Sequence, residues 1–110
     1  MAIRDCEKAA ELLLLEATVQ DLSVRNTHLY CLRADKSEFG GTWQDSVLHG
    51  VALNGTLCRG LNVQSTTLED YLILRNTTVE NLRTRRLRYA RGLRVVRENV
   101  RYEGGEEFSG

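Results

Sequence analysis

The chain has 110 residues, which is enough for one small domain with a core of its own. Apolar residues make up 42% and charged residues 27%, a globular composition that argues against intrinsic disorder. The formal net charge is zero, but residues 1–50 carry five Lys/Arg and eight Asp/Glu, whereas residues 51–110 carry ten Arg and seven Asp/Glu.

The cysteines and the N-terminus indicate the cellular compartment in which the protein is expected. Cys6, Cys31 and Cys58 are odd in number and widely spaced, which does not suit a disulfide framework and favours reduced thiols. The N-terminus has charges of both signs and lacks the form of a secretory signal. The longest apolar run is far shorter than the roughly 20 residues that a membrane helix needs. We therefore expect a cytoplasmic protein without a membrane span.

Residues 1–16 are predicted to form a helix that caps the N-terminal end of the domain. Apolar residues recur there at three- and four-residue spacing, which is the period of an amphipathic helix. These residues are Ile3, Cys6, Ala10, Leu13 and Leu14.

Beyond residue 16 the apolar period changes to five. The most regular stretch is 61–73, where apolar or small residues come in pairs two positions apart. The pairs are Leu61 with Val63, Thr66 with Leu68, and Tyr71 with Ile73. The rhythm extends from about residue 17 to residue 90 with one-residue slips, and the first members of the pairs alternate between large and small. A ten-residue unit therefore overlies the five-residue one.

This rhythm predicts a β-solenoid. A spacing of two puts both members of a pair on one face of a short extended segment, and the return after five residues requires a corner. A helix would repeat at 3.6 residues instead. Stacked coils of this kind share backbone hydrogen bonds along the axis. A β-sandwich or roll with Thr-rich strands is the alternative, followed by a fold that contains more helix.

The pattern resembles that of the pentapeptide-repeat proteins. Central inward residues of that family are matched by Leu29, Phe39, Leu48, Leu53, Leu68 and Ile73, and the small inward partners by Ala17, Thr27, Ser37, Ser46, Thr56 and Thr66. The resemblance implies a right-handed, four-sided, single-stranded β-helix of about four coils over residues 17–102. The bactofilin-like polymer-forming proteins are the rival resemblance.

The C-terminal third is rich in arginine. Arg83, Arg85, Arg86, Arg88, Arg91, Arg94, Arg97 and Arg101 fall within 19 residues, opposed only by Glu98. Residues 87–101 could be strand or helix, and β-branched Val95 and Val96 together with Gly92 favour strand. Residues 103–110 are expected to form a flexible acidic tail.

The arginines are the candidate partner-binding site. They could bind an anionic partner, above all an acidic protein surface, or they could only protect the exposed strand edges at the end of a solenoid. The candidate residues are Arg83, Arg85, Arg86, Arg88, Arg91, Arg94 and Arg97, together with Trp43. Trp43 is the single tryptophan, and it could serve as a partner anchor or pack in the core.

No catalytic pattern stands out. Asp45, Ser46 and His49 are residue types of a hydrolase triad, but the G-x-S-x-G turn is absent. Neither C-x-x-C nor H-x-x-x-H occurs, so we expect no metal site, no cofactor and no enzyme activity.

The expected function is therefore that of a non-enzymatic interaction or scaffold module, which binds a protein partner through its ends or its side face. The alternative is a self-assembling polymer of end-to-end stacked solenoids. Regulation of nucleic-acid machinery ranks lower: the pentapeptide-repeat family includes gyrase inhibitors that mimic DNA through a strongly acidic surface, whereas this chain is neutral. Nucleic acid is an unlikely partner also because few aromatic residues are available for base stacking.

Overall fold

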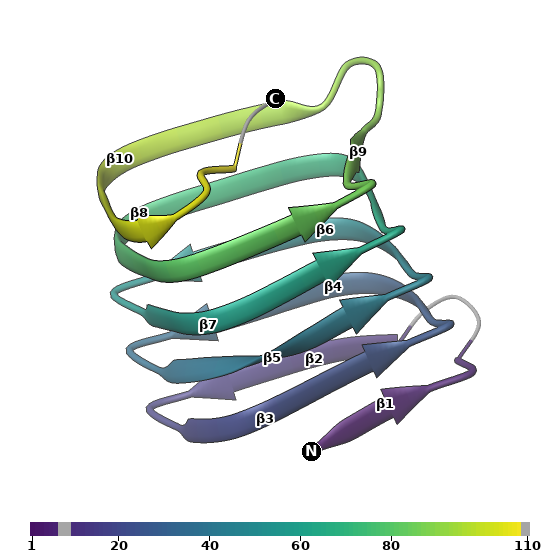
Figure 1. Cartoon of the computed structure of the whole chain (residues 1–110), viewed down its shortest axis with the longest axis horizontal. Helices are drawn as coiled ribbons and strands as arrows, with labels where there is room; N and C mark the ends of the chain where they lie inside the picture. The colour runs from purple at the N-terminus through teal and green to yellow at the C-terminus, as the bar shows by residue number, and fades with distance from the viewer. Residues whose placement is uncertain (7–9, 109–110) are drawn as a thin grey trace.

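The computed structural model describes residues 1–6 and 10–108, and within them the chain is all β (Figure 1). The strands are β1 (Ala2–Arg4), β2 (Ala10–Leu15), β3 (Thr18–Arg25), β4 (His28–Asp35), β5 (Glu38–Gln44), β6 (Val47–Asn54), β7 (Leu57–Gln64), β8 (Thr67–Arg85), β9 (Arg88–Tyr89) and β10 (Arg94–Gly105). They pair in the order β1-β3-β5-β7-β8-β6-β4-β2, and β9 and β10 pair with β8.

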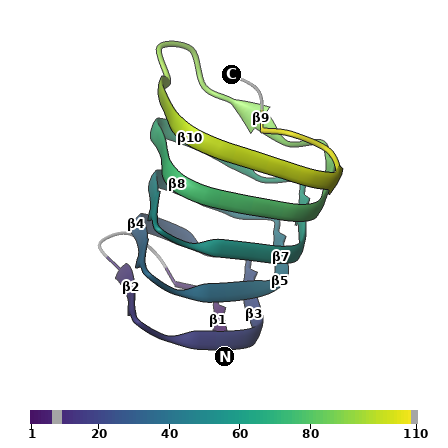
Figure 2. The same cartoon turned by 90° about the vertical axis from the view of Figure 1, so that its left-hand side faces the viewer.

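The chain winds as a solenoid. All the pairings are parallel and join one coil to the next, so that Val24 of β3 lies beside Trp43 of β5, 19 positions later. The long strand β8 shows the winding most directly, because its first half pairs with β6 and its second half with β7. Figures 1 and 2 show the coils stacked from the N-terminal end to the C-terminal end. The predicted all-β solenoid is confirmed, with about five turns instead of four.

The corners explain the ten-residue unit. Asn26 and Asp45 have φ of 48° and 51°, in the left-handed region that Asn and Asp tolerate best. Buried Thr27 and Ser46 follow them, and each hydroxyl donates to the carbonyl oxygen two residues earlier at 2.8 Å. The Ser46 hydroxyl also accepts the N–H of Thr27 from the neighbouring coil at 3.2 Å. Short polar side chains therefore satisfy backbone groups inside each corner and tie adjacent coils together.

Most predicted inward positions are confirmed. The buried central residues are Leu29, Phe39, Leu48, Leu53 and Leu68, and the buried small partners are Thr27, Ser37, Ser46, Thr56 and Thr66. Ala17, near the N-terminal end, is half-buried. These side chains fill the interior of the stack, and burial of their apolar surface is the main favourable contribution to folding.

The register predicted for Tyr71 and Ile73 is wrong. Leu72 and Leu74 are buried, whereas Tyr71 and Ile73 lie on the outer side, so the slip comes directly after Leu68. The reason is visible across the sheet. Tyr71 pairs with Gly50, where an added Cβ would overlap the tyrosine ring. The glycine makes room for the ring to lie across the outer face.

The predicted N-terminal helix is also wrong. The described part of residues 1–16 forms β1 and β2, and residues 7–9 lie outside the described residues. Leu14 is buried, while Leu13 and Leu15 are exposed, which is the period of a strand. Parallel pairing of β2 with β4 supplies the hydrogen bonds and outweighs the helix propensity of a leucine-rich segment.

The C-terminal segment folds onto the last coil. Strand was favoured over helix for 87–101, and β9 and β10 confirm it. The expected flexible tail is wrong for 103–108, because β10 extends to Gly105 and residues 106–108 cross the end of the stack (Figure 1). We call residues 106–108 the C-terminal strap. Phe108 is buried in the core cluster, whereas residues 109–110 lie outside the described residues.

Candidate functional site

The arginine-rich segment forms one coil at the C-terminal end. Arg83 and Arg85 lie at the end of β8, Arg88 lies in β9, and Arg94 and Arg97 lie in β10. The predicted site residues therefore surround the stack and do not share one face (Figure 2). Their roles differ with their position on this coil.

Two of the arginines, Arg94 and Arg97, make contacts within the protein. Arg94 lies 3.6 Å from the Asp70 carboxylate, and its guanidinium lies over the Tyr71 ring at 5.9 Å from the centroid. Arg97 donates to the carbonyl oxygen of Phe108 at 2.9 Å. Arg97 pairs with buried Leu74 of β8, so it occupies a strand position whose side chains point toward the interior of the stack. At the end of the stack this inward arginine holds the strap in place.

Arg83 acts on the strap through Glu106. The Glu106 carboxylate accepts the N–H of Thr84 at 2.6 Å and its hydroxyl at 2.9 Å. These hydrogen bonds, with the nearby charge of Arg83, lower the pKa of Glu106 below its ordinary value. The contacts of Arg94 and Arg97, together with the charge of Arg83 near Glu106, therefore stabilise the C-terminal coil.

The other four arginines form a separate feature. Arg85, Arg86, Arg88 and Arg91 are all exposed and lie around the turns on either side of β9; we call them the basic corner. Within residues 1–6 and 10–108 no ion pair or hydrogen bond is found for any of their side chains. By contrast, Arg33, Arg59, Arg75 and Arg101 each pair with a carboxylate.

Arg86 occupies a left-handed backbone position, as Glu16 and Lys36 do at other corners. Its φ of 57° is in the left-handed region, at a corner where the preceding coils carry Asn26, Asp45 and Ser65. Arginine gains no local hydrogen bond there of the kind that makes Asn and Asp tolerant of this conformation. The residue is therefore held at a conformational cost.

Trp43 is not available to a partner. Its exposed fraction is 0%, and its ring stacks on Phe39 with 6.1 Å between centroids. Among the described residues its indole N–H has no hydrogen-bond partner. The proposed role as a partner anchor is wrong, and the core-packing alternative describes this residue.

A polar cluster on the outer face of β4, β6 and β8 was not predicted from the sequence. His49 stacks on Tyr30, and its Nδ1 and Nε2 lie 3.3 and 3.5 Å from Glu69 and Asp70. Nearby, the Tyr71 hydroxyl lies 3.2 Å from the Cys31 sulfur. That hydrogen bond and partial burial raise the pKa of Tyr71 to about 12. These contacts join residues 19 to 40 positions apart, so no local motif could have revealed them.

This cluster does not assemble a recognisable reactive centre. Both His49 nitrogens face carboxylates, and the Ser46 hydroxyl is used inside its own corner. Asp45, Ser46 and His49 are therefore not arranged as a triad. In the described part of the chain, no group of three or more His, Cys, Asp or Glu side chains could hold a metal ion.

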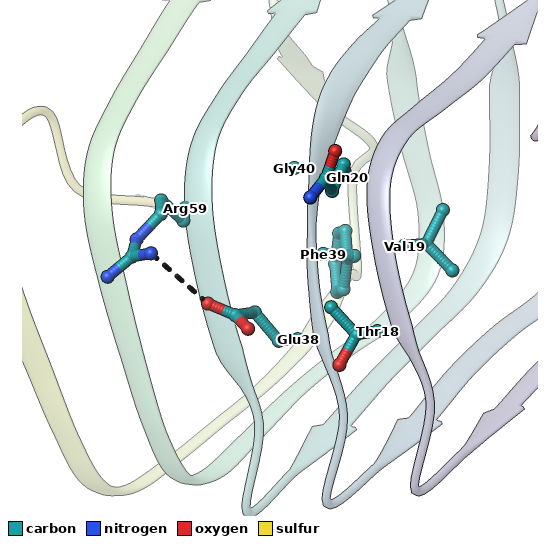
Figure 3. Close-up of a pocket in the computed structure, with 7 residues that line it drawn as sticks. All are labelled: Thr18, Val19, Gln20, Glu38, Phe39, Gly40 and Arg59. Atoms are coloured by element: carbon teal, nitrogen blue, oxygen red, sulfur yellow. Dashed lines mark ion pairs between the residues drawn. The ribbon is translucent and has the colours of Figure 1, made fainter.

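A surface hollow of about 310 Å³ lies over β3, β5 and β7, on the side of the stack opposite to the His49 cluster. Figure 3 shows the residues that line it. Thr18, Gln20 and Glu38 line it, and Gly40 leaves the space because an added Cβ would overlap the backbone of Arg59. Arg59 is held by Glu38 at 3.4 Å and by Glu80 at 2.9 Å. The charge in this hollow is thus already neutralised, unlike that of the basic corner.

Comparison of the chain with protein-family models, with curated proteins and with solved structures finds no match. The structure also contains no helix that could cross a membrane within the residues it describes. The site must therefore be interpreted from its own chemistry.

Proposed function

We propose that the protein is a non-enzymatic interaction module that binds an acidic protein surface through the basic corner. The observation that carries the proposal is a contrast among the arginines: Arg85, Arg86, Arg88 and Arg91 are exposed and without ion pairs, while Arg33, Arg59, Arg75, Arg94 and Arg101 each pair with a carboxylate. Four adjacent guanidinium groups repel one another in the free protein, and carboxylates of a partner would relieve this repulsion.

An acidic protein fits better than nucleic acid. The chain is neutral overall, so long-range attraction to a polyanion is weak. The aromatic residues near the corner, Tyr89 and Tyr102, are half-buried and pack against the core, where they cannot stack on bases. A rigid coil with fork-shaped donors suits bidentate pairing with Asp and Glu side chains.

The alternative function, a polymer of solenoids stacked end to end, has less support. Head-to-tail stacking needs two open ends, and the strap with Phe108 and Arg97 occupies the C-terminal one.

The proposal also includes two points about the fold. The coils wind in a right-handed sense, and the chain is related to the pentapeptide-repeat proteins. The free cysteines support a cytoplasmic setting.

The test is binding to a fluorescent polyglutamate peptide. The double variant Arg85→Gln/Arg88→Gln is expected to raise the Kd about tenfold, equivalent to about 1.4 kcal/mol. The control Arg33→Gln/Arg101→Gln removes the same net charge from arginines that are already paired, and should leave the Kd nearly unchanged. Binding by the wild type should weaken as salt is added.

Two results would contradict the proposal. Equal weakening by both double variants would show that only net charge matters. Tighter binding of a duplex DNA of equal charge, lost in the same corner variant, would assign the site to nucleic acid instead.

A further inference from the structure

The two ends of the stack differ in how their strand edges are protected. At the C-terminal end, the exposed edge is rich in arginine, Arg97 points inward, and the strap covers the interior. Inward-pointing charges and covering segments are the devices by which natural sheets prevent edge-to-edge pairing. This end is therefore protected against a second chain.

At the N-terminal end, β2 is an edge without such protection. Among the described residues β2 pairs only with β4, and its sequence AELLLL has one charge in six residues. Leu13 and Leu15 are 61% and 62% exposed on its outer side. Ala10 and Leu12 face inward and are only partly covered. A long apolar edge of this kind is a template for another strand.

The backbone of β2 also has groups available for pairing. The N–H of Glu16 donates to the carbonyl oxygen of Asp35 at 2.9 Å, toward β4. Because successive residues of a strand direct their N–H and C=O groups to opposite sides, those of Leu13 and Leu15 point to the open edge. The side chains that are most exposed therefore belong to residues with unpaired backbone groups.

We propose that two copies of this chain associate head to head through β2, as a closed dimer with antiparallel β2–β2 pairing. The two-fold axis is perpendicular to the sheet formed by β2, β4 and β6 and passes between the two copies. It places β2 beside β2 of the other copy, and the interiors of the two stacks then lie on one common axis. Opposite residues of an antiparallel pair share a face, so Leu12 and Leu14 meet inward residues of the other copy. Leu13 and Leu15 then meet outward residues.

The size of the end limits what a dimer contact can bury. The extents of the chain across the stack axis are 31 and 21 Å, which bound the projected backbone area at about 650 Å². This is at the lower end of the roughly 600–1,000 Å² per partner that specific interfaces bury. The C-terminal ends of the dimer stay covered by their straps, so assembly ends at two chains. The basic corner lies at the other end of the stack and takes no part in this contact.

The first experiment measures molar mass by light scattering over a range of concentrations. The wild type is expected at twice the 12.5 kDa chain mass. Leu13→Lys places a charge at the apolar edge and, since the side chain is exposed, should leave the fold intact while it weakens dimerisation at least about tenfold. The control Ala52→Lys lies in the same outward column two coils inward and should remain a dimer.

The second experiment measures amide hydrogen exchange. Protection of the Leu13 and Leu15 amides should increase with protein concentration, while protection of the Leu14 amide, on the side of β4, should not. A wild type that stays monomeric, a Leu13→Lys variant that dimerises as tightly as the wild type, or a wild type that grows into longer polymers would each overturn the closed dimer. Circular dichroism of each variant checks that the solenoid is retained.

Discussion

At the scale of single residues, the interior shows how strongly the stack excludes water. Cys58 is 0% exposed and lies between Phe39 and Val79 of the adjacent coils. Burial disfavours the charged thiolate and raises the pKa of Cys58 from 9.0 to about 12. Cys6 and Cys31, in contrast, are only partly buried.

We expect iodoacetamide to modify Cys6 and Cys31 in the native protein and Cys58 only after unfolding, as followed by mass spectrometry. Modification of Cys58 at the native rate of the other two would show that the interior opens readily.

The same thiol makes stability depend on pH. Below pH 9 the thiol is protonated in both states, and above it the unfolded chain loses the proton while the folded chain keeps it. The free energy of unfolding should therefore fall as the pH rises from 9 to about 12, by at most about 1.4 kcal/mol per pH unit from this group. Urea unfolding of Cys58→Ala should lack this contribution. The difference between this variant and the wild type therefore separates the effect of the thiol from that of the tyrosines, which also titrate at high pH.

At the scale of the elements, the corners are where the chain adopts costly left-handed conformations. Arg86 is at a left-handed corner that Asn26 occupies in an earlier coil. Arg86→Asn should raise the free energy of unfolding by about 0.5–1 kcal/mol because Asn tolerates this conformation better. It should also weaken polyglutamate binding, since a charge of the basic corner is lost.

A matched variant tests this opposition between stability and binding. Arg88→Asn removes an equivalent charge from β9, where φ is not positive and Asn is a poor strand residue. It should weaken binding and leave stability unchanged or slightly lower. If Arg86→Asn destabilised the protein as much as Arg88→Asn does, strain at Arg86 would be excluded.

The sequence predicted the elements wherever the signal was local and repeated. Pairs such as Thr56 with Cys58 report directly which side chains face the interior, because strand geometry alternates and the corners recur. The errors came from contacts between coils. The slip after Leu68 depends on Gly50 giving room to Tyr71, and the strand at 10–15 depends on pairing with β4.

The candidate site was predictable only as a stretch of sequence. The density of arginine was evident, but which residues are paired depends on partners in other coils, as for Arg94 with Asp70. Trp43 could not be assigned without the core, because it follows Gly40 and Gly41, whose role depends on contacts with other coils. In the structure those glycines allow the backbone of neighbouring coils to approach closely.

At the scale of the whole molecule, the two ends of the stack are unlike. The N-terminal end presents the apolar edge of β2, whereas the C-terminal end is covered by the strap, with Phe108 only 3% exposed and Glu106 bound to Thr84. A solenoid with one covered end can pair once but cannot propagate. The strap is therefore expected to limit the size of the assembly.

Phe108→Ala should remove this limit. The substitution takes a large apolar side chain from the end of the core, and we expect a loss of about 3 kcal/mol in the free energy of unfolding. It also uncovers the inward side chains of the last coil, such as Val95 and Tyr102, so light scattering should show species larger than those of the wild type at equal concentration. Glu107→Ala, an exposed neighbour in the same strap, is the control and should change neither quantity. A Phe108→Ala protein that is destabilised but keeps the wild-type molar mass would show that the edge charges, with Arg97 among them, protect this end without the strap.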